Sequence, residues 1–219
     1  MTHIYLVRHA ETNLNADPTT IWWRSNHIEI SKIWHKQWKL LQNYIATSNN
    51  LVDVLYVSTA IRTKQTSYYV AKWLWYSKAP IIDDRLQEID QWDWTGKNRK
   101  EIYTQKIIDI IQKDPLWFTP PNGESINMVW DRMNEVLDEI IQKYPDWYAR
   151  IVSHGVAIAA TIMKRFGITW STVKSWPHSN TWITTIHYDP NPKSIVSWRI
   201  LSYNNDSHLP PEYRTIQLV

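Results

Sequence analysis

The chain has 219 residues, enough to bury a sizeable core, and we expect residues 1–219 to form a single domain. It contains no Cys, which excludes disulfides, thiol catalysis and Cys-ligated metals and is typical of a reducing cytoplasm. The net charge of +3 suits small anionic ligands but is too mild and too dispersed to indicate nucleic-acid binding. No leader precedes the first predicted strand and the longest apolar stretch is too short to cross a bilayer, so we expect a cytoplasmic protein that binds no membrane.

Short apolar strands alternate with helical patterns along most of the chain. In chain order, the sequence predicts a strand at 3–8, a helix at 31–48, a strand at 53–57, a helix at 60–75, a strand at 79–82, helices at 98–113 and 124–143, a strand at 149–153 and a helix at 155–166. The tail differs, because 182–188 and 194–203 alternate apolar and polar residues around a turn at 189–192, which predicts a hairpin on the sheet. Alternating strands and helices favour a layered α/β sandwich.

The first predicted strand ends in a cation and an imidazole. Apolar residues at 4–7 are followed by Arg8, His9 and, two positions later, Glu11. Open α/β sheets build their sites at the carboxyl ends of their strands, so this end could offer an anion binder and a nucleophile. A basic strand end that faces solvent explains the same residues, and the choice depends on whether other segments supply partners.

Four later segments supply such partners. Arg62 lies in the first turn of a predicted helix, where an anion is favoured, and Glu88 lies between apolar neighbours, where its pKa could be raised. Glu124 follows a Pro-rich loop, and His154 ends a second apolar strand. Each signal alone also fits an ordinary surface or structural role. Together, two strand-end His residues and two Arg residues would form a cationic cluster that cradles a phosphoryl group.

These motifs resemble the histidine phosphatase superfamily, also called the phosphoglycerate mutase-like family. Its hallmark is an Arg-His-Gly-Glu-Thr strand end, which this chain carries at 8–12 with Ala10 in place of Gly. The remaining matches span nearly the whole chain: Ser58, Arg62 with Gln65-Thr66, Leu86-Gln87-Glu88, the Pro-x-Gly-Glu-Ser loop at 121–125, Val152-Ser153-His154-Gly155, and Asn180. The resemblance implies a three-layer αβα sandwich with a mostly parallel central sheet.

The resemblance also implies a reaction and the residues that perform it. His9 would be the nucleophile that becomes phosphohistidine, and Glu88 would protonate the leaving alcohol and later activate water. The phosphate oxygens would be held by Arg8, Arg62, His154 and, as a further polar contact, Asn15. We therefore expect a phosphomonoester hydrolase of the histidine acid phosphatase type. It would act on a small phosphorylated metabolite, with no cofactor and no metal, and homodimer formation stays open.

Alternative functions come from the same family and from a different class. A phosphoglycerate mutase would use the same first half-reaction and return the phosphoryl group to a bound product. Such mutases tend to carry a longer insertion than the 34 residues that lie between Glu88 and Gly123, which favours the phosphatase. A catalytically inactive binding module would need a lost core residue, and all five core positions are present. A Trp-rich protein that stacks on nucleic acid or sugars is the remaining alternative.

The chain has 15 Trp and only 4 Gly, although ordinary usage near 7% would give about 15 Gly. Several Trp, such as Trp34, Trp73, Trp75, Trp147 and Trp182, occupy turns and helix ends that favour positive φ and therefore glycine. Some bacterial lineages decode UGA as glycine, and we hypothesise that translation with a codon table that reads UGA as tryptophan produced many of these Trp. The twelve candidate positions are 22, 23, 34, 38, 73, 75, 92, 130, 147, 170, 176 and 182. Adding these 12 to the 4 Gly present gives 16 and leaves 3 Trp.

Overall fold

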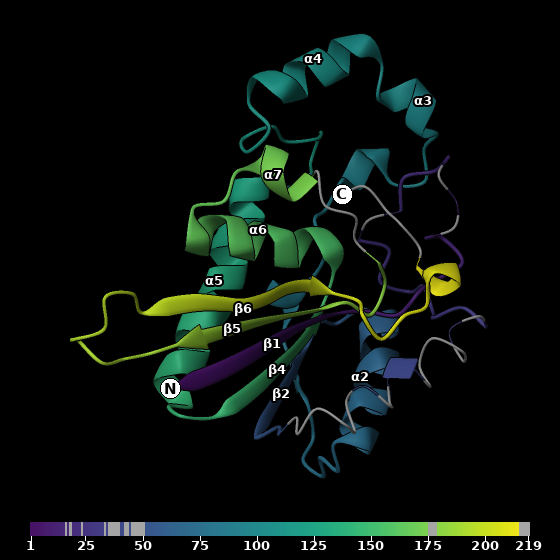
Figure 1. The fold of residues 1–219 in the computed structure, drawn as a ribbon. Coiled ribbons are helices and arrows are strands. Elements are labelled where there is room, and N and C mark those ends of the chain that lie inside the picture. Colours follow the sequence, from purple (N-terminus) through teal and green to yellow (C-terminus); the bar gives the residue numbers. More distant parts are fainter. Residues whose placement is uncertain are drawn as a thin grey trace.

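The computed structural model of the protein is shown in Figure 1. It describes residues 1–15, 17, 19–22, 24–32, 34, 40–41, 44, 51–174 and 179–214. Most of the helix predicted at 31–48 lies outside the described residues, and so do Trp23, Trp38 and Trp176.

A six-stranded sheet forms the centre of the molecule, in the order β3-β2-β4-β1-β5-β6 (Figure 1). Its strands are β1 (Thr2–Arg8), β2 (Val54–Val57), β3 (Ile81–Ile82), β4 (Tyr148–Ser153), β5 (Ile183–Tyr188) and β6 (Trp198–Asn205). The first four strands pair in parallel, whereas β5 joins β1 and β6 antiparallel, as the predicted hairpin requires. Because β4 lies between β2 and β1, the carboxyl ends of these three strands meet at one edge of the sheet.

The helices predicted at 60–75, 124–143 and 155–166 are present, whereas the one at 98–113 is divided and a short helix at 170–174 was not predicted. The helices are α2 (Ile61–Trp73), α3 (Arg99–Ile102), α4 (Gln105–Lys113), α5 (Ile126–Lys143), α6 (Gly155–Phe166), α7 (Trp170–Lys174) and the 3₁₀ turns η1 (Asp84–Leu86), η2 (Trp92–Trp94) and η3 (Pro211–Tyr213). The prediction of a single helix at 98–113 is wrong, because the chain forms two helices there, α3 and α4. Tyr103 ends α3, and its hydroxyl donates to Gln91 while its ring packs against Trp94. Within the described part of the chain, no helix has the length and apolar character needed to span a bilayer.

Helices cover both faces of the sheet, which confirms the three-layer αβα sandwich. Alternate residues of β1 point to opposite faces, as the pleat of a strand dictates. Ile4 and Leu6 pack in one core with residues of α5 and α6, and Val7 packs in a second core with Val70 of α2. Each such fully buried aliphatic side chain contributes about 1.5–3 kcal/mol. These contacts hold the strand that carries Arg8 and His9 rigidly within the sandwich.

The backbone at the tryptophans agrees only in part with the expected positive φ. Trp75 has φ 54° and Trp92 has φ 26°, conformations that favour glycine. At Trp147 and Trp182 the expectation is wrong, because the preceding residues Asp146 and Thr181 adopt the positive φ instead. The expectation of a positive φ is also wrong at Trp34 and Trp73, because both residues are helical and Trp73 is the last residue of α2.

Trp75 follows α2 in a geometry that glycine ordinarily takes. Leu74 is the C-cap residue of α2, and the N–H of Tyr76 donates to the carbonyl of Ala71 at 2.9 Å. This bond is the 6→1 hydrogen bond of a Schellman motif, whose left-handed residue is here Trp75. The Trp75 side chain is 92% exposed, so no packing offsets the backbone strain.

Candidate active site

Residues from the ends of β1 and β4, the start of α2 and the segment after η1 meet at the edge of the sheet where the parallel strands end. Arg8 ends β1 and His9 follows it, Arg62 lies in the first turn of α2 after β2, and His154 follows β4. Glu88 comes from the loop after η1. All five side chains are buried, and the structure thus brings together five of the six residues expected to form the site.

The ring of His9 is fixed by its own backbone. Its Nδ1 donates to the carbonyl of Ala10 at 2.6 Å, so in the neutral ring the lone pair lies on Nε2. The backbone N–H of His9 continues the sheet by donating to Ser153 at 3.0 Å. Burial, and then the charges of Arg62 and Arg8, lower the pKa of His9 well below 6.5. His9 is therefore a neutral imidazole at neutral pH.

Arg8 and Arg62 supply two buried positive charges beside His9. Burial lowers the pKa of each to about 10, so both remain protonated at neutral pH. Arg62 donates to the carbonyl of Ser25 at 2.6 Å, which anchors its guanidinium. A Cβ at Gly155 would lie 3.4 Å from Cζ of Arg8, an ordinary van der Waals contact, so the start of α6 lies directly beside that guanidinium.

His154 lies next to His9, with ring centroids 5.1 Å apart. Its Nδ1 is 3.0 Å from Nη2 of Arg62, and its Nε2 is 2.9 Å from the hydroxyl of Ser58. Burial, followed by the charge of Arg62, lowers its pKa well below 6.5. Both imidazoles of the cluster are therefore neutral, and the two arginines carry its positive charge.

The carboxyl group of Glu88 lies at the N-terminus of α6. It accepts hydrogen bonds from the N–H groups of Ile89, Val156 and Ala157 at 2.9, 3.2 and 3.1 Å. Burial raises the pKa of Glu88 above 4.5, although two of these N–H groups and the two arginines oppose that shift. A carboxyl group with a raised pKa can hold a proton and release it to a reacting group.

Asn15 lies in the loop after β1 and is linked to the cluster through Asn180. Its Oδ1 accepts from the N–H and the hydroxyl of Thr12 at 2.8 and 2.9 Å. Asn180 bridges the two regions, because its Nδ2 donates to the carbonyl of His9 at 3.1 Å and to Oδ1 of Asn15 at 3.4 Å. Asn15 as a phosphate contact stays a prediction.

Alanine is accommodated at position 10, where the resembling family has glycine. Ala10 is fully buried, and its N–H donates to the hydroxyl of Thr66 at 3.0 Å. It is not among the residues with positive φ, so its backbone does not require glycine. The departure from the motif therefore leaves the geometry at His9 intact.

Two arginines near Glu88 were not predicted from the sequence. Arg24 and Arg132 both donate to the carbonyl of Glu88, at 2.9 and 3.2 Å. Both also pair with Glu124. A basic residue eight positions after Glu124, about two helical turns away, is a signal that could have indicated the second pairing.

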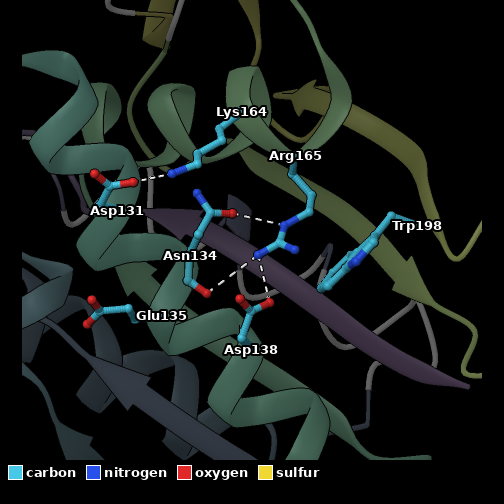
Figure 2. Close-up of a pocket in the computed structure, with 7 residues that line it drawn as sticks. All are labelled: Asp131, Asn134, Glu135, Asp138, Lys164, Arg165 and Trp198. Carbon is cyan, nitrogen blue, oxygen red and sulfur yellow. Dashed lines mark hydrogen bonds and ion pairs between the residues drawn. The ribbon is translucent and has the colours of Figure 1, made fainter. Parts of the chain in front are cut away.

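A separate surface pocket lies between α5, α6 and β6 (Figure 2). Its lining residues are Asp131, Asn134, Glu135, Asp138, Lys164, Arg165 and Trp198. Within the pocket, Lys164 pairs with Asp131, and Arg165 donates to Asp138 at 2.8 Å and stacks on Trp198 (Figure 2). None of these residues belongs to the cluster around His9.

Comparisons with known proteins show the family of the chain. The model of the histidine phosphatase superfamily (branch 1) matches residues 4–201. The chain is 27% identical over 206 residues to Phosphoserine phosphatase 1 of Hydrogenobacter thermophilus, covering 91% of this chain and 93% of that protein. It is 24% identical over 220 residues to the Probable phosphoglycerate mutase GpmB of Cronobacter sakazakii, covering 95% of each.

The fold is also found among solved structures. Bacillus stearothermophilus YhfR superposes with a TM-score of 0.78 at 23% identity, over 95% of this chain and 99% of that one. The match of the family model over nearly the whole chain gives the assignment: this protein belongs to the histidine phosphatase superfamily, branch 1.

Proposed function

We propose that the protein is a phosphomonoesterase that hydrolyses small phosphorylated metabolites through a phosphohistidine on His9. The observation that carries this proposal is the hydrogen bond from Nδ1 of His9 to Ala10, which directs the lone pair of a neutral imidazole to Nε2. A low pKa keeps that nucleophile unprotonated, and the neighbouring arginines attract the phosphate dianion.

In the first half-reaction, Nε2 of His9 attacks phosphorus, and the bond from phosphorus to the ester oxygen breaks. Glu88 gives its proton to that oxygen, so the leaving group departs as a neutral alcohol. Arg8, Arg62 and Asn15 donate to the three remaining phosphoryl oxygens and offset their charge in the transition state. His154 supplies a further donor through its Nε2–H, which it shares with the hydroxyl of Ser58. This charge compensation needs no metal, because two buried guanidinium groups provide it.

In the second half-reaction, the Glu88 carboxylate takes a proton from water. The water oxygen attacks phosphorus, the bond from phosphorus to Nε2 breaks, and inorganic phosphate leaves. Glu88 ends protonated and His9 ends neutral, so both are ready for another cycle. The proposal uses residues 1–219 as one catalytic domain, which the nearly full-length family match supports.

The substrate is a small phosphorylated metabolite, and phosphoserine is the first compound to test. The relative from Hydrogenobacter thermophilus is named a phosphoserine phosphatase, and its length matches that of this chain. A phosphoglycerate mutase is the second candidate, because a full-length relative carries that name. The segment between Glu88 and Gly123 favours the phosphatase, since it holds only η2 and the short helices α3 and α4.

The test is a panel of phosphorylated metabolites that includes phosphoserine, sugar phosphates, nucleotides and 3-phosphoglycerate. Release of inorganic phosphate and conversion of 3-phosphoglycerate to its 2-isomer are measured in the same samples. We expect phosphate release that is lost in His9→Ala. Isomerisation without phosphate release would favour the mutase, and binding of a metabolite without turnover would contradict both enzymes.

A further inference from the structure

Arg132 of α5 donates hydrogen bonds to the backbone around Glu88. Nη1 of Arg132 donates to the carbonyls of Arg85 and Gln87 at 2.7 and 2.6 Å. Its Nη2 donates to the carbonyl of Glu88 at 3.2 Å. Three carbonyls within four residues therefore bind one guanidinium, whose planar shape fixes their relative positions.

Arg24, from a different segment of the chain, also donates a hydrogen bond to this backbone. Its Nε donates to the carbonyl of Glu88 at 2.9 Å, and its Nη1 donates to Asp90 at 3.2 Å. The carbonyl of Glu88 thus accepts from two guanidinium groups. This pairing anchors the backbone of Glu88 directly.

Glu124 holds both arginines in place. It accepts from Nε and Nη2 of Arg132 at 3.1 and 3.0 Å, a bidentate pair, and from Nη2 of Arg24 at 2.7 Å. Burial would raise the pKa of Glu124, but Arg132, Arg24 and the N–H of Asp90 outweigh it and hold that pKa below 4.5. Glu124 is therefore ionised at neutral pH.

The conformation of the loop before α5 places Glu124 beside Arg132 and Arg24. The N–H of Glu124 donates to the carbonyl of Asp90 at 2.8 Å. A Cβ on Gly123 would lie 2.5 Å from that same carbonyl oxygen, so only glycine permits the approach. The Pro-x-Gly-Glu-Ser loop thus docks against the segment that follows Glu88.

We propose that Arg132, held by Glu124, is a positioning residue for the proton transfer by Glu88; this rests on the proposed role of Glu88. The Glu88 carboxyl is bound by Val156 and Ala157 of α6, and its backbone by Arg132 and Arg24. The side chain is therefore fixed at both ends. All five hydrogen bonds of Arg132 to described residues end on Arg85, Gln87, Glu88 and Glu124, so among the residues of the cluster it bonds directly to Glu88 alone.

The experiment measures kcat/KM for phosphate esters whose alcohols differ in acidity. A good leaving group, such as p-nitrophenol, departs without a proton, whereas an alkyl alcohol such as that of phosphoserine needs one. A general acid contributes about 10²- to 10⁴-fold, and a misplacement of about 1 Å can cost about 10²-fold. In Arg132→Met we expect kcat/KM to fall about 10-fold or more for alkyl esters and less than about 3-fold for p-nitrophenyl phosphate.

Two further variants keep the test informative. Glu124→Gln, which keeps the shape and weakens the hold on both arginines, should show the same leaving-group dependence if Arg132→Met fails to fold. Arg165→Met is the matched control, because Arg165 also makes several hydrogen bonds and a stacking contact, but in the separate pocket (Figure 2). We expect its leaving-group dependence to equal that of the wild type.

The outcomes separate this inference from the function on which it rests. Glu88→Gln should steepen the leaving-group dependence; if it does not, the proposed role of Glu88 is wrong. If Glu88→Gln steepens it while Arg132→Met and Glu124→Gln lower kcat/KM equally for all esters, the positioning role of Arg132 is overturned. A steeper dependence in Arg132→Met or Glu124→Gln, absent in Arg165→Met, supports the inference.

Discussion

Arg62 donates a hydrogen bond from Nη2 to Nδ1 of His154, at 3.0 Å. A guanidinium can only donate, so Nδ1 accepts, and the proton of the neutral imidazole lies on Nε2. That proton faces the hydroxyl of Ser58, 2.9 Å away. Arg62 therefore fixes the tautomer of the ring that lies against His9.

The first prediction concerns Ser58, which is fully buried. Ser58→Ala leaves the Nε2–H of His154 without its acceptor, so we expect the free energy of unfolding to fall by about 1–3 kcal/mol. We also expect kcat/KM to fall, because the ring loses one of its two anchors. Chemical denaturation and phosphate release measure the two effects.

The control for that prediction is Ser67→Ala. The Ser67 hydroxyl donates at 2.8 Å to the carbonyl of Lys64, within α2 itself, and is not bonded to the cluster. Its removal should change kcat/KM little. Equal losses of activity in the two variants would refute a specific role for Ser58.

The second prediction concerns pH. The nucleophile acts unprotonated, above the pKa of His9, and the acid acts protonated, below the pKa of Glu88. At the ordinary pKa values of about 6.5 for histidine and 4.5 for glutamate, no pH leaves both groups mainly in their active forms. Burial moves the pKa of His9 down and that of Glu88 up, which brings the two active ranges toward overlap. We expect kcat/KM for phosphoserine to persist below about pH 6.5, where an ordinary histidine is protonated, and to fall on the alkaline side.

The alkaline fall is assigned by comparing the wild type with Glu88→Gln across pH. Ionisation of the substrate affects both enzymes equally and cancels in the ratio of their kcat/KM values. We expect this ratio to decline as Glu88 ionises. A ratio that is constant across pH would show that a different group causes the fall.

The third prediction concerns Trp75, whose φ of 54° places it in the left-handed region. The strain costs a non-glycine residue roughly 1–2 kcal/mol, so Trp75→Gly should raise the free energy of unfolding by about 1 kcal/mol. Trp117→Gly is the control, because Trp117 is also exposed and is not among the residues with positive φ. Chemical denaturation should show no gain there.

The gene provides an independent test of the glycine hypothesis. We expect UGA codons at most of the twelve candidate positions, including those of Trp75 and Trp92. Mass spectrometry of the protein from its native host should then show glycine at these positions. UGG codons at most of them would refute the hypothesis.

Local sequence patterns predicted the elements that carry the chemistry. The apolar run before Arg8, the second one before His154 and the alternation of strands and helices each depend on neighbouring residues, and the structure has these elements close to their predicted bounds. Parallel pairing of β1 and β4 then brings the two strand ends together. The pairing therefore places His9 next to His154.

Long-range contacts explain what the patterns missed. Arg132 lies in an ordinary amphipathic helix, and its bonds to Arg85 and Glu88 cross 47 and 44 positions of the chain. Tyr103 has no helix-breaking character of its own, and its contacts with Gln91 and Trp94 end α3. Such partners are decided by tertiary packing, which no window of neighbouring residues contains.

The most direct test of the account is to identify the phosphorylated residue. The enzyme is mixed with ³²P-labelled phosphoserine, or with whichever ester the panel selects, quenched within one turnover, and mapped by peptide digestion under alkaline conditions that preserve phosphohistidine. We predict label on the peptide that contains His9, and none in His9→Ala. Label on a different residue, or turnover that persists in His9→Ala, would contradict the account.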